Sequence, residues 1–175
     1  MFLKFGIMKT IFRIIAILLI TNSANCQNSF TRKVSVSGFN NDTVIMYIDS
    51  MDLQGELPIP RDSNNEIIGI VGFKLSSEER LLRLVTEIFS ENEIQGLISS
   101  NSFIEIVCLS DGKILSVSYG FFEKKPDVCL SKLEKLSSIM KEEFTLQTEF
   151  EEEVDKEGYV KCSYKLSREL RKFIE

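Results

Sequence analysis

Carboxylates and thiols are the side chains that could do chemistry in this 175-residue chain, because the sequence contains no histidine. Without an imidazole base, Ser-His-Asp and Cys-His catalysis are excluded, and so are histidine-containing metal triads. Phosphate-binding loops, dinucleotide-binding turns and the G-x-S-x-G nucleophile turn are also missing, and "GIVG" (69–72) has the wrong spacing. The sequence therefore predicts no enzyme activity and no cofactor.

Three thiols follow the N-terminal segment, at Cys108, Cys129 and Cys162. An odd number allows at most one disulfide, and the sequence leaves open which two cysteines, if any, are joined. Their wide spacing and the missing histidine argue against a zinc site. Free cysteines mostly behave as small buried hydrophobic residues, which is the expectation here. An enzyme built on this chain would have to use carboxylates or Cys129.

An acidic run near the C-terminus is the other candidate for chemistry. It does not match a calcium-binding EF-hand loop, which needs acidic residues at alternate positions, a central glycine and a later glutamate. The alternation instead predicts a solvent-facing row on a strand, where like charges discourage edge-to-edge pairing. Weak cation binding and glycosidase-type acid–base catalysis are the alternatives. The run consists of Glu149, Glu151, Glu152, Glu153, Asp155 and Glu157.

Residues 1–26 have the composition of a secretion signal peptide. Three basic residues precede or interrupt an apolar run at 14–20, and a short polar segment follows. Small residues before the junction predict cleavage between Cys26 and Gln27. Two alternatives are an uncleaved membrane anchor, although a span needs about 20 apolar residues, and a lipoprotein acylated on Cys26.

The remaining residues, 27–175, have the length of one domain. A chain of this size buries roughly 70% of its extended surface and needs no disulfides to hold a core. The formal charge falls from −5 to −8 when the three basic residues of the leader are left out. Nucleic acids and anionic membranes attract basic proteins, so neither is the expected partner. We expect another protein as the partner, and membrane contact only through an uncleaved leader.

Several strands and two helices follow from the apolar periodicity. Strands are expected at 33–39, 43–49 and 66–75, with a loop at 53–65, and Gly69 and Gly72 mark a bulge or a close backbone approach. A helix is expected at 76–89, with Ser76 and Glu79 as a capping box. A second helix follows Asp127 as its cap. Its apolar stripe consists of Leu130, Leu133, Leu136, Met140 and Phe144.

The stretch 103–121 is the most strongly patterned part of the chain and predicts a β-hairpin. Asp111 and Gly112 are placed at the centre of a two-residue type I′ turn. This register pairs Cys108 with Leu115, Ile106 with Val117, and Ile104 with Tyr119, so that one face is wholly apolar. The helix bearing Leu133, Leu136 and Met140 is expected to cover that face.

A second hairpin is expected between 144–154 and 159–166, followed by a terminal helical turn. The predicted fold class is therefore α+β, a mostly antiparallel sheet with two amphipathic helices packed on one face. Residues 27–175 form a single domain in this interpretation. Its N-terminal part (34–75) is rich in strands, and its C-terminal part (76–175) has the order helix, hairpin, helix, hairpin.

The order of elements from 76 to 166, with "SDGKI" at the hairpin tip, resembles the C-terminal domain of TonB-type energy-transducing proteins. The family's Tyr-Pro element is missing, since "GFKLSSEERLL" stands in its place. The leader ending before Gln27, together with "SSNSFIEIVCLSDGKILSV", resembles small exported Bacteroidota proteins of uncharacterised function. That resemblance implies a periplasmic or secreted location in the cell envelope of a Gram-negative bacterium.

These observations predict a non-catalytic binding or interaction module. The resemblance to the TonB-type domain implies that the last strand is an exposed sheet edge, to which a partner could add a strand. An envelope-associated structural protein, retained by its N-terminus, is the alternative. Thr43 and Ser50 stand in Asp-Ser/Thr-aliphatic motifs and are possible glycosylation sites. The candidate edge residues are Tyr159, Val160, Lys161, Cys162, Ser163 and Tyr164.

Overall fold

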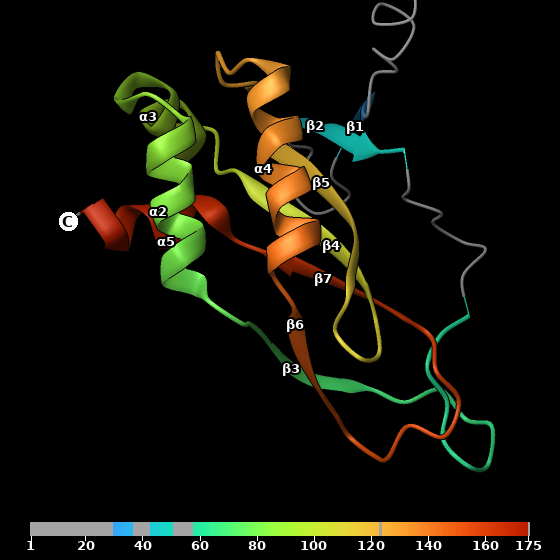
Figure 1. Cartoon of the computed structure of the whole chain (residues 1–175). Helices are drawn as coiled ribbons and strands as arrows, with labels where there is room; N and C mark the ends of the chain where they lie inside the picture. Colours follow the sequence, from blue (N-terminus) through green and yellow to red (C-terminus); the bar gives the residue numbers. More distant parts are fainter. Residues whose placement is uncertain (1–29, 37–42, 51–57, 123, 175) are drawn as a thin grey trace, which may run out of the picture.

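The computed structural model describes residues 30–36, 43–50, 58–122 and 124–174. They form a five-stranded antiparallel sheet in the order β1-β2-β5-β4-β7 and a two-stranded sheet, β3-β6 (Figure 1). The predicted α+β class is confirmed. The elements are β1 (Phe30–Val36), β2 (Thr43–Asp49), β3 (Ile70–Leu75), α2 (Glu78–Ile88), α3 (Glu91–Ser99), β4 (Phe103–Leu109), β5 (Ile114–Phe122), α4 (Leu130–Glu143), β6 (Leu146–Phe150), β7 (Tyr159–Tyr164) and α5 (Leu166–Ile174).

The β4–β5 hairpin has a longer turn than the sequence predicted. Gly112 N–H donates to Leu109 C=O (2.9 Å), and Leu109 N–H donates to Lys113 C=O (3.0 Å). Gly112 has φ +90°, whereas Asp111 is not among the described residues with positive φ. A type I′ turn needs positive φ at both central residues. The prediction is therefore wrong, and the turn is a three-residue loop, Ser110 to Gly112, that uses Asp111 Oδ1 to accept from Lys113 N–H (2.9 Å).

A β-bulge at Leu115 restores the predicted faces of the hairpin. Cys108 pairs with Ile114 rather than with Leu115, and the register shifts at this point. Beyond the shift, Ile106 lies opposite Val117 and Ile104 lies opposite Tyr119, as predicted. The extra loop residue moves the register by one, and the extra residue of the bulge moves it back. Ile114 replaces Leu115 in the apolar face.

Helix α4 covers that apolar face, as the sequence predicted. Leu133, Leu136 and Met140 are buried and belong to one core cluster with Ile104, Ile106, Cys108, Ile114, Val117 and Tyr119. The Tyr119 hydroxyl donates to the Leu133 carbonyl oxygen (3.1 Å), which anchors the helix to the centre of the sheet. Burial raises the pKa of Tyr119, so the hydroxyl keeps the proton that this bond requires.

The predicted cap residues of both helices are wrong. Ser77, not Ser76, precedes α2, and it makes no side-chain cap bond. Ser76 does not cap the helix either, and its hydroxyl accepts from Thr145 N–H (3.1 Å). Cys129, not Asp127, precedes α4.

A capping box does occur, one helix later, where Ser90 and Glu93 start α3. The side chain of Lys132 on α4 also bonds Glu93. That bond and the Ser90 N–H lower the pKa of Glu93 to about 2, and the ionised carboxylate ties α3 to α4.

The predicted second hairpin is also wrong. β6 pairs with β3, and β7 pairs with β4. The segment between them does not turn back on itself, because Lys156 and Arg61 exchange backbone hydrogen bonds (2.9 and 3.1 Å). β6 is also held at the tip of the first hairpin, where Leu146 N–H donates to Gly112 C=O (2.9 Å).

β1 and β2 belong to the same five-stranded sheet as β4, β5 and β7, whereas β3 pairs with β6 in the small sheet. β2 has the predicted bounds, β1 begins before the predicted start at 33, and β3 carries a register shift between Ile70 and Gly72, where a bulge was expected. Asp49 at the end of β2 is buried and accepts from Lys141 Nζ on α4 (2.9 Å) and from Val117 N–H (3.2 Å). Within the described ranges, no helix is long and apolar enough to cross a membrane.

Candidate binding edge and its two pockets

Strand β7 lies at one edge of the five-stranded sheet, and β4 is the one strand it pairs with among the described residues. Its Val160, Cys162 and Tyr164 side chains are buried on the helix-covered face, whereas Lys161 and Ser163 are exposed on the other face. The position of these predicted site residues thus agrees with an edge strand. Strand addition there stays a prediction.

Backbone alternation decides which groups of β7 face outward. In an antiparallel ladder, every second residue directs its N–H and C=O to the same neighbour. Tyr159 directs its N–H away from β4, to Pro58 C=O (2.8 Å), so Lys161 and Ser163 direct theirs outward as well. The 58–61 segment covers the start of the strand. Among the described residues, the part left uncovered is 161–165, except that the Lys165 carbonyl accepts from Arg168 N–H (3.2 Å) and Glu169 N–H (3.3 Å) at the start of α5. We call 161–165 the β7 edge.

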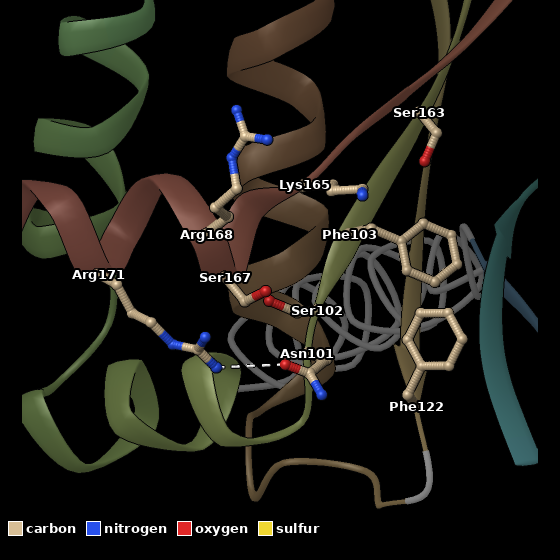
Figure 2. Close-up of a pocket in the computed structure, with 9 residues that line it drawn as sticks. All are labelled: Asn101, Ser102, Phe103, Phe122, Ser163, Lys165, Ser167, Arg168 and Arg171. Atoms are coloured by element: carbon tan, nitrogen blue, oxygen red, sulfur yellow. Dashed lines mark hydrogen bonds between the residues drawn. The ribbon is translucent and has the colours of Figure 1, made fainter. Parts of the chain in front are cut away.

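A cavity of about 510 Å³ opens beside the β7 edge, on the face of the sheet opposite α4 (Figure 2). This volume is within the range of small-ligand sites. We call it the basic pocket, because three of its described lining residues are cationic and none is acidic. The residues come from the start of β4, the end of β5, the end of β7 and α5: Asn101, Ser102, Phe103, Phe122, Ser163, Lys165, Ser167, Arg168 and Arg171.

Two phenylalanine rings form the apolar wall of the basic pocket. Phe103 and Phe122 lie with ring centroids 5.4 Å apart and a tilt of 45°. Phe103 lies directly over Gly120, its partner in the β4–β5 ladder, since a Cβ there would be 2.0 Å from the ring. Glycine at this position therefore leaves the space that Phe103 occupies.

The cations of the basic pocket differ in how far they are neutralised. Arg168 Nε is paired with the Glu169 carboxylate (2.7 Å). Arg171 donates to two neutral acceptors, Asn101 Oδ1 (3.2 Å; Figure 2) and the Ile98 carbonyl (3.2 Å). Lys165 makes no ion pair with any described residue. Two positive charges therefore remain available to a ligand.

Buried hydroxyls lie behind these cations. Ser167 N–H at the start of α5 donates to Ser102 C=O (3.0 Å) and joins the helix to the beginning of β4. The Ser102 residue is 1% exposed, and its Oγ has no hydrogen-bond partner among the described residues. A buried polar group without a partner is unfavourable, so a ligand or water that reached Ser102 would gain a hydrogen bond.

A second cavity, also about 510 Å³, lies on the other side of the β7 edge. We call it the mixed-charge pocket, because Lys74, Glu78 and Glu169 line it together with apolar residues of β3. Ser163, Lys165 and Arg168 line both pockets, so this short segment is the wall between them. Burial and then the Glu78 carboxylate raise the pKa of Tyr164, whose phenol stays protonated here.

The three described cysteines are free thiols. Burial raises the pKa of Cys108 to about 12 and that of Cys162 to about 11. Cys129 is exposed, as the sequence did not predict, and a hydrogen bond with Ser131 lowers its pKa. Among the described residues, Cys129 does not belong to any group of cysteines and carboxylates that could hold a metal ion.

Thiol labelling of the native protein should therefore modify Cys129 and leave Cys108 and Cys162 protected until the protein unfolds. The thiolate is the reactive form, and its population rises as the pKa falls. Iodoacetamide labelling, mapped by peptide mass spectrometry with and without urea, measures this. Labelling of Cys108 at the rate of Cys129 in the native state would contradict the burial described here.

The other sequence candidates lie away from the two pockets. The six acidic residues from Glu149 to Glu157 are exposed, and Glu151 packs against Gly69. Thr43 and Ser50 are exposed at the two ends of β2, and their modification stays a prediction. The predicted cleavage site, Cys26 and Gln27, lies outside the described residues.

Apart from Ser163, sequence patterns did not single out the residues of the basic pocket. Phe103 was assigned only to a strand, and Phe122 to no element. Lys165 was assigned to the predicted strand 159–166, and Arg171 fell in the tail that was expected to add a helical turn. One signal was present, since Lys165, Arg168 and Arg171 are three cations spaced by three in an acidic chain. Residues three apart share a helix face, so this spacing could have indicated a basic surface.

Comparisons with known proteins support the fold but do not indicate an activity. No family model matches the sequence, and no curated protein matches it. The chain is similar to a crystal structure of a DUF5043 family protein from Bacteroides uniformis, with a TM-score of 0.54 at 15% identity, over 78% of this chain and 80% of that chain. This likeness supports a shared fold and agrees with the expected resemblance to Bacteroidota proteins. It does not show the resemblance to the TonB-type domain.

Proposed function

We propose that this protein is an exported, non-catalytic module that binds an extended segment of a partner protein by strand addition to the β7 edge. The observation that carries the proposal is the open stretch 161–165, which has outward backbone groups and a pocket on each side. Main-chain hydrogen bonds of an added strand supply affinity, and pockets for alternate side chains supply specificity.

The geometry of an added strand fits the two pockets. Successive side chains of a strand point to opposite faces of a sheet. A segment hydrogen-bonded to Ser163 would therefore place one side chain in the basic pocket and the next in the mixed-charge pocket. Both pockets meet at Ser163, Lys165 and Arg168, so neighbouring residues of one ligand can reach them.

Export is the other part of the proposal, and it rests on the composition of residues 1–26. Cleavage before Gln27 would place the module in the periplasm or outside the cell. An envelope-associated structural protein, retained by an uncleaved leader or by a lipid on Cys26, is the second candidate. The mass of the protein recovered from the producing cell separates these forms.

A proline at position 163 tests strand addition. Proline has no N–H and is tolerated at an edge when the missing donor faces outward. Ser163→Pro should therefore abolish binding of peptides while the β4–β7 ladder stays intact. Ser163→Ala removes the hydroxyl but keeps the N–H, and should bind peptides like the native protein.

The measurement uses seven-residue peptides selected from a random library on the native protein, with affinities determined by isothermal titration. Circular dichroism confirms that both variants are folded. Equal affinity of native protein and folded Ser163→Pro would overturn strand addition at this edge. A library that yields no binder to the native protein would overturn it as well.

A further inference from the structure

The charges of the basic pocket indicate which chemical group it binds. The chain as a whole carries a formal charge of −5, yet the described residues of this pocket include three cations and no carboxylate. Cations gathered in a concave site in an otherwise acidic protein attract an anion there.

Lys165 and Arg171 approach the basic pocket from different elements. Lys165 follows β7 directly and points toward the side of the pocket where Phe103 lies, whereas Arg171 on α5 is held by Asn101 (Figure 2) and by the Ile98 carbonyl. Neither cation makes an ion pair with a described carboxylate. An anion can therefore bind the Lys165 ammonium without displacing a carboxylate of the protein.

Ser102 adds a hydrogen-bonding group that has no partner in the described part of the chain. The Phe103 and Phe122 rings form the opposite wall. A free phosphate or sulfate would leave this apolar wall in contact with water. An anion attached to an apolar or aromatic body satisfies the charges and covers the rings together.

We propose that the basic pocket binds a carboxylate that carries an adjoining aromatic or large apolar group. Lys165 holds the carboxylate, and Phe103 and Phe122 contact the apolar group. Two sources have this chemistry, the C-terminal residue of a peptide and a free aryl-alkanoic acid. In its peptide form the inference rests on the proposed function, because a strand added parallel to β7 would end with its carboxylate at Lys165.

Titration of the whole protein with N-acetyl-phenylalanine tests the pocket by itself, followed by two-dimensional amide NMR. We expect saturable binding, with shifts at Phe103, Phe122, Lys165 and Ser167. N-acetyl-phenylalaninamide lacks the charge, and its affinity should be lower by a factor of about 10 or more, because charge-assisted hydrogen bonds are stronger than neutral ones.

Lys165→Ala should weaken N-acetyl-phenylalanine binding by about 10-fold. Lys135→Ala is the matched control, since it removes the same charge from an exposed position on α4, on the face of the sheet opposite the basic pocket. Its affinity should be unchanged. Equal binding of acid and amide, or equal weakening by Lys135→Ala and Lys165→Ala, would overturn the assignment.

The source of the carboxylate is decided by a third comparison. A seven-residue peptide that ends in phenylalanine should bind the native protein more tightly than N-acetyl-phenylalanine, and Ser163→Pro should remove this advantage. That result supports a peptide terminus. A second outcome is that N-acetyl-phenylalanine binds the native protein and Ser163→Pro with equal affinity, and that the peptide binds no more tightly than N-acetyl-phenylalanine. This outcome would support a site for a free acid and would overturn strand addition.

Discussion

Gly112→Ala will lower the free energy of unfolding by roughly 3 kcal/mol. Gly112 has φ +90°, a conformation that costs a residue with a Cβ about 1–2 kcal/mol. The new Cβ would also lie 2.5 Å from the Leu146 carbonyl oxygen. The hairpin tip and β6 must then separate, which breaks the bond from Leu146 N–H to Gly112 C=O (2.9 Å).

Urea denaturation followed by circular dichroism measures this change. Gly72→Ala is the matched control, because Gly72 does not have positive φ and its new Cβ would meet only the Glu149 carboxylate, at 3.8 Å. We expect the control to change stability by less than about 1 kcal/mol. Similar losses for the two variants would show that the hairpin tip does not support β6 as described.

Leu136→Ala will lower the free energy of unfolding by about 3 kcal/mol, within the usual range for a truncated buried leucine. Leu136 is 0% exposed and lies in the middle of α4, between Leu133 and Met140 on the face that covers the sheet. Alanine favours the helix itself, so the loss comes from the cavity under α4 and not from helix propensity.

Thermal unfolding offers a direct measurement, with an expected fall in melting temperature of about 2–4 °C for each kcal/mol in a domain of this size. Lys135→Ala on the same helix is the control, since Lys135 is exposed and the helix gains the same residue. Its melting temperature should stay within about 2 °C of the native value. Equal melting temperatures of Leu136→Ala and Lys135→Ala would contradict the packing of α4 on β5.

The apolar pattern of 103–121 predicted five of the six hairpin residues that face the core, because the burial of one face tolerates no slip by one residue; only Leu115 was wrong, since Ile114 takes its place. It did not predict the turn. Asp-Gly is compatible with two-residue and three-residue loops. The bulge at Leu115, which compensates for the three-residue loop, has no signal in the local sequence. Side-chain alternation was thus a stronger constraint than turn composition.

Strand pairing was predictable only where the chain turns back at once. β4 and β5 are joined by four residues, 110–113, and their pairing followed from the sequence. β6 and β7 are separated by eight residues, 151–158, and within this segment Asp155 and Lys156 bond the backbone of Arg61, nearly a hundred positions earlier. Non-local pairing of this kind depends on contacts that no short pattern contains.

The candidate site shows the same division. The β7 edge was anticipated from the resemblance to the TonB-type domain, which implied that the last strand lies at a sheet edge. The basic pocket could not be anticipated, since Phe103 on β4, Phe122 on β5 and Lys165 just after β7 meet only once the sheet order is known. Their individual residue types are ordinary at the ends of strands.

Compared with a hairpin that has a two-residue turn and no bulge, this hairpin has one extra residue in the loop of Ser110 to Gly112 and one extra residue at the bulge, Leu115. Either insertion alone would turn Val117 and Tyr119 outward and empty the space beneath α4. Deletions in this region should therefore be tolerated in pairs and not singly. A related chain with a two-residue turn and no bulge could therefore have the same core, with a shorter hairpin tip next to β6.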